Sequence, residues 1–125
     1  MRIAIDTGGT FTDCVTLSDG KLQVLKLFST PGDASQAVLD ICEQESLVFL
    51  PWAPIQQAGK NVGVLSAAER LGATEYQVVL AWLLSFSHVM LPIPGTGSPA
   101  HVADNIAAAG LELTGDEERA IRDGG

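Results

Sequence analysis

Residues 3–13 read IAIDTGGTFTD, and this stretch decides how the chain begins to fold. A short apolar run ends in an acid, a loop with two glycines follows, and an extended segment then runs to a turn at residues 18–20. This order predicts a strand, a tight loop and a returning strand. Paired glycines let backbone amides approach a phosphate, because no Cβ blocks the approach. We therefore place this hairpin at the centre of the fold, with a candidate phosphate-binding loop made of Asp6, Thr7, Gly8, Gly9 and Thr10.

Composition limits the classes of protein that the chain can represent. With 125 residues, 46% of them hydrophobic and 18% charged, it is expected to form one globular domain. Fifteen acids against seven bases give a net charge of −8, which disfavours nucleic acid and anionic membranes as partners. The longest apolar run, residues 78–84, is far shorter than the roughly 20 residues that span a bilayer. We expect a soluble, cytoplasmic protein without a signal peptide and without membrane contact.

The two cysteines, Cys14 and Cys42, stand apart and lack the spacing of a zinc site. This pattern favours two reduced, buried thiols over a disulfide framework. No metal site is predicted from them.

The first half of the chain continues with three predicted elements. Residues 21–28, KLQVLKLF, alternate approximately and predict a third strand. Asp33 and Gln36 have the spacing of a capping box, which predicts a helix over residues 34–45. Residues 47–50, LVFL, predict a strand buried on both faces.

The second half predicts three helical segments and one more strand. A helix over residues 64–71 ends at Gly72, and a capping box at Thr74 opens its continuation through residue 84. Residues 89–93, VMLPI, predict a buried strand that contains a proline. Ser98 as N-cap with proline after it predicts a helix that ends at Gly110. A capping box at Thr114 predicts a last helix over residues 115–122.

The element order is therefore β-β-β-α-β-α-β-α, with a short final helix. This order predicts an α/β domain with a single mixed five-stranded sheet of the ribonuclease H-like type, with strand order 3-2-1-4-5. The alternative is a domain-swapped or irregular α/β assembly.

Two resemblances to known families share this chain. Residues 1–41, through IDTGGTFTD and KLFSTPGDASQAVLDI, resemble the amino terminus of the hydantoinase A and 5-oxoprolinase family. In that family this loop lies beside nucleotide phosphates, so the resemblance implies ATP as a ligand. The second phosphate loop and the second lobe of such an ATPase have no counterpart among these residues.

Residues 42–125 are similar to the last two strand-helix units of the aldo-keto reductases, through CEQESLVFLPWAPI and the long segment that starts at AERLGATEYQ. The resemblance implies NADPH as a ligand and assigns its adenosine phosphate to the loop of Gly95, Thr96, Gly97 and Ser98. His101 stands where an arginine often occurs in the family, and Asn105 is expected to face the adenine.

The catalytic tetrad of the reductases comes from earlier strands that this chain lacks. Asp6, Tyr76, Lys60 and His88 have the right chemistry, but none lies at a matching position. We therefore predict a recombined or engineered chimera, one domain joined near Ile41, without catalytic function and without a required cofactor. The alternative is a weak nucleotide-binding module for NADPH or ATP that retains a parental phosphate loop.

Two further hypotheses concern metal chemistry and self-association. The ribonuclease H-like fold suggests a metal-dependent nuclease with Asp6 as one ligand, but the neighbouring strand ends without an acid, which argues against it. Residues 78–84, VVLAWLL, are apolar around the whole helix. From Val78 to Leu84 this surface exceeds one contact face, so we predict a homodimer through it.

Overall fold

A computed structural model describes residues 2–29, 34–51, 55 and 58–124 of the chain. Backbone contacts divide it into two compact units, residues 1–49 and residues 50–125. The predicted join near Ile41 falls inside the first unit, and the assembly of both fragments into a single domain stays a prediction.

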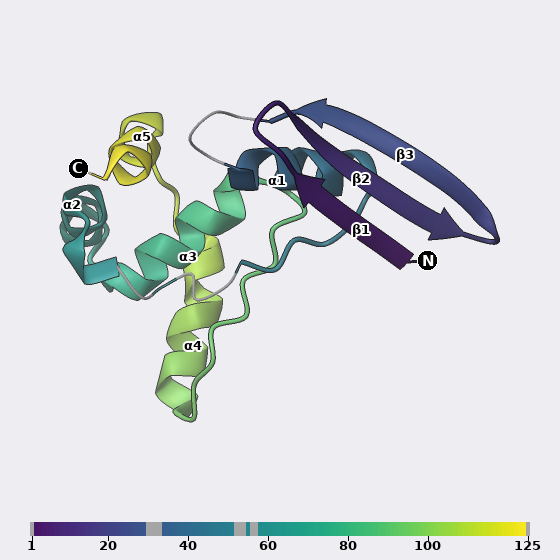
Figure 1. Ribbon diagram of the computed structural model, residues 1–125. Helices are drawn as coiled ribbons and strands as arrows, with labels where there is room; N and C mark the ends of the chain where they lie inside the picture. The colour runs from purple at the N-terminus through teal and green to yellow at the C-terminus, as the bar shows by residue number, and fades with distance from the viewer. Residues whose placement is uncertain (1, 30–33, 52–54, 56–57, 125) are drawn as a thin grey trace. The chain divides into compact units, whose positions relative to one another are not determined.

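The first unit contains a three-stranded antiparallel sheet of β1 (Arg2–Thr7), β2 (Phe11–Ser18) and β3 (Lys21–Phe28), as Figure 1 shows. The three predicted strands are confirmed. A two-residue turn joins β2 to β3, and both Asp19 (φ 51°) and Gly20 (φ 74°) have the left-handed backbone that such hairpin turns require. The turn fixes the register, in which Val15 pairs with Val24.

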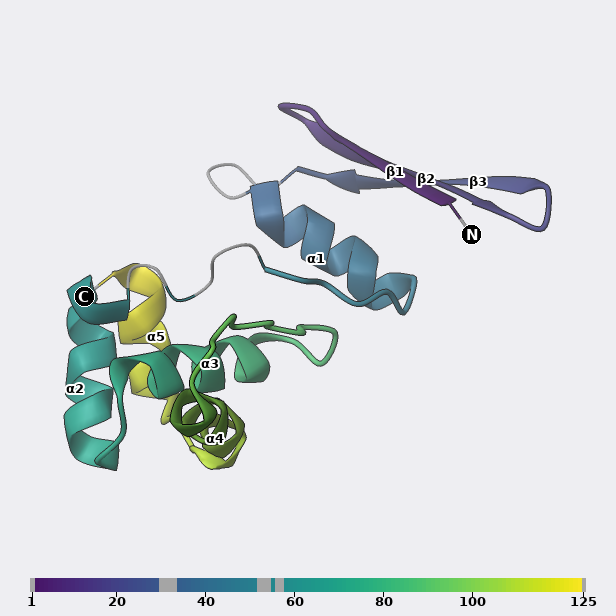
Figure 2. The same cartoon turned by 90° about the horizontal axis from the view of Figure 1, so that it is seen from below.

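Helix α1 (Ala34–Gln44) covers one face of this sheet, as Figure 2 shows. The residues of β2 on that face, Thr12, Cys14 and Thr16, are buried, and so are Ile41 and Cys42 of the helix. Both cysteines thus pack as small apolar residues between sheet and helix. The predicted helix is confirmed to within one residue at its end. Its predicted capping residue, Asp33, lies outside the described residues.

The predicted five-stranded ribonuclease H-like sheet is wrong. The only sheet among the described residues has three strands in the order β1-β2-β3, so β2 lies at its centre and β1 at an edge. The segments 47–50 and 89–93 are not strands, and only Phe49 and Met90 in them have β-bridge pairing. The prolines at positions 51, 92 and 94 offer no amide hydrogen, which limits the ladder these segments can form.

The second unit is helical. It consists of η1 (Ala58–Lys60), α2 (Val62–Leu71), α3 (Glu75–Phe86), α4 (Pro99–Ala107), η2 (Ala108–Gly110) and α5 (Gly115–Asp123). The predicted helix ends at which capping residues were named agree, because the caps are formed by those residues. Elsewhere the bounds differ: α2 begins two residues earlier, where Asn61 caps it, α3 continues to Phe86, and α4 gives way to η2 before Gly110. Gly72 ends α2 with φ 61°, and complete capping boxes open α3 at Thr74 and α5 at Thr114. Ser98 caps α4.

Helix α3 forms the core of this unit, and it contacts α2, α4, η1 and η2. Five residues of the apolar segment 78–84 are buried within the chain, and Leu84 is 40% exposed. The homodimer through this segment stays a prediction.

Helices α2 and α5 lie side by side because Gly63 lets their backbones approach. A Cβ at Gly63 would lie 2.7 Å from the backbone of Ala120 and Ile121. The N-cap residue Asn61 also donates a hydrogen bond to the carbonyl of Ile121 at 2.7 Å. Arg70 of α2 makes a bidentate ion pair with Glu117 of α5.

Among the described residues, no helix has the length and apolar character needed to cross a membrane.

Candidate functional site

The glycine loop of the first unit connects β1 to β2 in a closed turn. The amide of Gly8 donates a hydrogen bond to the carbonyl of Phe11 at 2.9 Å. Asp6 pairs across the ladder with Asp13, and Gly9 and Thr10 lie in the turn itself. The amide of Gly8 is therefore already engaged within the chain.

Ser29, just after β3, holds this loop in place. Its hydroxyl donates to the carbonyl of Gly8 at 2.7 Å and lies 3.0 Å from the hydroxyl of the buried Thr12. Its amide donates to the carbonyl of Thr10 at 2.9 Å. These contacts make the loop a rigid part of the hairpin.

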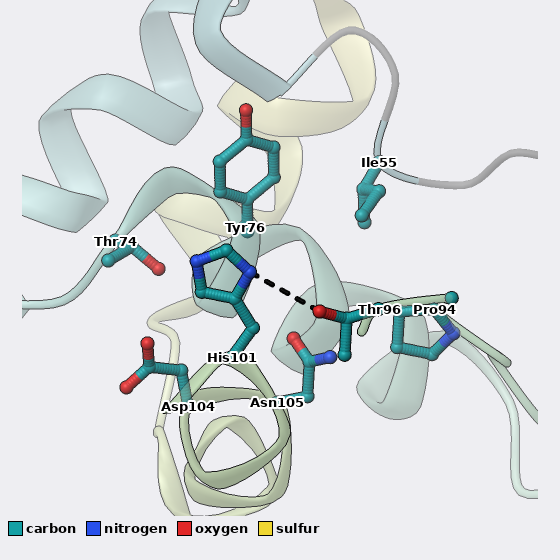
Figure 3. A pocket seen from close by; sticks show the side chains of 9 residues that line it. Ile55, Thr74, Tyr76, Pro94, Thr96, His101, Asp104 and Asn105 are labelled. Atoms are coloured by element: carbon teal, nitrogen blue, oxygen red, sulfur yellow. Dashed lines mark hydrogen bonds between the residues drawn. The ribbon is translucent and has the colours of Figure 1, made fainter. Parts of the chain in front are cut away.

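The second unit holds a pocket of 330 Å³ where the segment before α4 meets the starts of α3 and α4. Figure 3 shows the side chains around it. Its lining combines apolar residues with a few polar groups, a composition typical of small-molecule sites. The described residues that line it are Ile55, Thr74, Tyr76, Pro94, Gly95, Thr96, His101, Asp104 and Asn105.

Four of the six residues predicted for the adenosine phosphate come together in this pocket, namely Gly95, Thr96, His101 and Asn105. The other two, Gly97 and Ser98, are not among its lining residues. Helical geometry explains one pairing, because positions 101 and 105 are four residues apart on α4 and share a face. The loop brings Thr96 to the same face.

A chain of hydrogen bonds orders the start of α4. The amide of Ser98 donates to Oγ1 of Thr96 at 3.1 Å, and Nδ1 of His101 lies 3.3 Å from the same oxygen. The amide of His101 lies 3.5 Å from the hydroxyl of Ser98, its N-cap partner. A hydroxyl can donate to a neutral imidazole or accept from a protonated one, so the contact between Thr96 and His101 is compatible with both charge states.

Sequence reasoning missed five residues of the pocket. Tyr76 is 54% exposed at the first turn of α3 and lines the pocket. Asp104 precedes the predicted Asn105 and supplies the pocket's one carboxylate. Ile55, Thr74 and Pro94 complete the set. The capping box at Thr74 marked the start of α3, but only the packing of α3 against α4 brings that start to the pocket.

The four residues with tetrad chemistry do not gather in one place. Tyr76 lines the pocket, whereas Lys60 and His88 are exposed and do not line it. Asp6 belongs to the other compact unit. Within the described part of the chain, no three His, Cys, Asp or Glu side chains are grouped so that they could hold a metal ion.

Comparison with protein families gives two matches. Residues 2–49 match the hydantoinase/oxoprolinase N-terminal region, and residues 63–123 match the aldo/keto reductase family. Both predicted resemblances are confirmed. Two unrelated families in one short chain are consistent with a chimera.

The curated relatives are similar to this chain over part of their length. The oxidoreductase C215.11c of Schizosaccharomyces pombe is 36% identical over 98 residues, which cover 76% of this chain and 32% of that protein. The pyridoxine 4-dehydrogenase of Escherichia coli is 37% identical over 83 residues, which cover 65% and 29%. The chain thus spans about a third of the length of these relatives.

Solved structures show a likeness of fold to aldo-keto reductases. The thermostable aldo-keto reductase Tm1743 superposes with a TM-score of 0.63 at 24% identity, over 73% of this chain and 34% of that one. The aldose reductase of Giardia lamblia gives a TM-score of 0.61 at 19% identity, over 74% and 34%. The likeness further contradicts the ribonuclease H-like prediction.

The two family resemblances overlap along the chain. A match that covers 76% of 125 residues leaves about 30 residues outside it, so the match to the Schizosaccharomyces protein begins no later than about residue 32. Helix α1 therefore falls within both matches. The predicted join near Ile41 lies inside this shared stretch.

The prediction that the chain has no enzymatic character is contradicted by these comparisons. The relatives are named as an oxidoreductase and a dehydrogenase, and the similar structures are reductases. The prediction relied on the missing catalytic tetrad. The absence of those residues does not bear on the family to which the remaining residues are similar. The relatives are oxidoreductases, and this chain is similar to about a third of their length.

Proposed function

We propose that residues 50–125 bind the adenosine end of a nicotinamide dinucleotide, as part of an aldo-keto-reductase-like oxidoreductase. One observation carries this proposal: the pocket unites Gly95, Thr96, His101 and Asn105, four residues to which the family resemblance assigns the adenosine phosphate and the adenine. When bound, the dinucleotide would supply hydride transfer.

The chemistry of the lining supports an adenine nucleotide. The carboxamide of Asn105 offers one donor group and one acceptor, the pair that an adenine edge matches. The ring of Tyr76 and the imidazole of His101 give flat surfaces for a base, and Ile55 and Pro94 add apolar contact. Thr96 and the start of α4 provide the polar end of the pocket, where a helix N-terminus favours an anion.

The glycine loop of the first unit is the weaker candidate for nucleotide binding. It is a closed turn whose Gly8 amide and carbonyl already have partners. ATP binding there stays a prediction and serves as a comparison in the titration.

Titration of the full chain with NADPH, NADH and ATP tests the proposal. We expect saturable quenching of tryptophan fluorescence by the dinucleotides. The Asn105→Ala variant should weaken binding by roughly tenfold, since a bidentate base contact contributes about 1–3 kcal/mol. The control is Gln44→Ala, at the exposed end of α1. Asn61→Ala is not used as a control because Asn61 caps α2. Absence of saturation at millimolar dinucleotide contradicts the proposal.

A further inference from the structure

We propose that this pocket selects a dinucleotide whose adenosine ribose carries a free 2′-hydroxyl, so that NADH binds more tightly than NADPH at neutral and higher pH. His101 is the one lining residue that can offset this preference. The inference rests on the proposed function and names the substrate class of the same site.

The charged side chains that line the pocket favour a ligand without a 2′-phosphate. Among its described lining residues there is one carboxylate, Asp104, one imidazole, His101, and no lysine or arginine. A 2′-phosphate is a dianion that proteins hold with arginine or lysine. The sequence neighbours of Ile55, residues 52–54 and 56–57, contain no basic residue either.

The lysine and arginine side chains of residues 50–125 lie elsewhere in the second unit and do not line the pocket. Arg70 and Arg119 form ion pairs with acids of α5. The guanidinium of Arg122 lies 5.5 Å from the ring centre of Phe86. Lys60 lies in η1 and does not line the pocket. A phosphate in the pocket would thus meet Asp104 without a guanidinium or ammonium group among the lining residues.

Asp104 should interact favourably with a ribose 2′-hydroxyl and unfavourably with a 2′-phosphate. A carboxylate accepts hydrogen bonds from ribose hydroxyls, as acids do in many NAD sites. The same carboxylate repels a phosphate dianion. A free 2′-hydroxyl is therefore the better match to Asp104.

His101 faces Asp104 on its own helix, Tyr76 from α3 and Thr96 from the preceding loop. Replacement of this imidazole by a guanidinium would place a permanent positive charge among the lining residues, so His101→Arg should favour NADPH.

The experiment measures the dissociation constants of NADH and NADPH for the full chain at about pH 8. We expect NADH to bind roughly tenfold more tightly. The His101→Arg variant should shift the ratio toward NADPH by about tenfold or more, because a guanidinium pairs with phosphate bidentately. Ser66→Arg adds the same charge at an exposed position of α2 outside the pocket and should leave the ratio unchanged.

Equal or tighter binding of NADPH at pH 8 overturns the inference while the proposed function stands. Failure of both dinucleotides to bind overturns the proposed function instead.

Discussion

The side-chain amide of Gln77 joins helix α3 to helix α4: its Nε2 donates a hydrogen bond to the backbone carbonyl of Asp104, with an N···O distance of 3.1 Å. The oxygen of the same amide accepts from the amide of Thr74 at 2.9 Å and completes the capping box of α3. One side chain thus caps α3 and links it to the helix that carries His101 and Asn105.

Substitution Gln77→Glu tests this link without removing the cap. Glutamate is equally suited to the third position of a capping box, but it loses the Nε2 donor and places a carboxylate against a carbonyl oxygen. We expect retained far-UV circular dichroism, faster amide hydrogen exchange in α4, and dinucleotide affinity reduced by about threefold to tenfold. Gln44→Glu makes the same chemical change at the exposed end of α1 and serves as the control. Unchanged exchange in α4 would show that the link does not position the helix.

The pair of Arg70 and Glu117 predicts a loss of stability in acid. Hydrogen bonds from the Arg70 guanidinium, with those from Thr114, lower the pKa of Glu117 from its ordinary value of 4.5 to about 2. A carboxyl group with a lowered pKa in the folded state stabilises that state above its ordinary pKa. This contribution is lost as the pH falls from about 4.5 toward 2.

Glu117→Gln removes the charge and keeps a side chain that can cap α5. We expect its Tm at neutral pH to be a few degrees lower than that of the unaltered chain, and the difference should shrink as the pH falls below about 4. Glu118→Gln, the next acid in the same helical turn, is the matched control for the helix dipole. The same pH dependence in both variants would assign the effect to the dipole rather than to the ion pair.

Gly63→Ala should loosen the contact between α2 and α5. The new methyl group would lie 2.7 Å from backbone atoms of Ala120 and Ile121, and backbone cannot move aside as a side chain can. We expect a destabilisation of about 1–3 kcal/mol. Tryptophan fluorescence measures it during denaturation, since Trp82 lies in α3 of the second unit.

Gly59→Ala is the control for this substitution, because a Cβ there has no atom within 4 Å. Its effect on stability should be near zero or slightly favourable. Equal effects of the two alanines would contradict the close approach of α2 and α5.

The predicted homodimer is tested by light scattering at high protein concentration. The exposed apolar part of the predicted interface includes Leu84, which lines a groove with Leu91, Val102 and Ile106. We expect a mass of twice 13.1 kDa, and Leu84→Lys should convert the dimer to monomer. Leu65→Lys on α2 is the matched control, since Leu65 is 41% exposed and Leu84 is 40% exposed. A monomer in the unaltered chain contradicts the prediction.

The sequence by itself determined the local structure of this protein. Helix ends at Gly72, Thr74, Ser98 and Thr114 were predictable, because a cap depends on residues within one turn of the chain. The hairpin through Gly20 was predictable for the same reason. The two family resemblances also depend only on the order of residues, and both were confirmed.

Tertiary structure determined how these elements pair and pack. A continuous apolar run such as residues 47–50 predicts a strand only if partners supply a ladder, and strand pairing is a long-range property that the run does not contain. The same reasoning applies to the site. Gly95, Thr96, His101 and Asn105 could be chosen from one short segment, but Tyr76 enters the pocket only because α3 packs against α4. Local hydrogen bonds are encoded by neighbours in sequence, whereas the pocket's shape depends on contacts between distant residues.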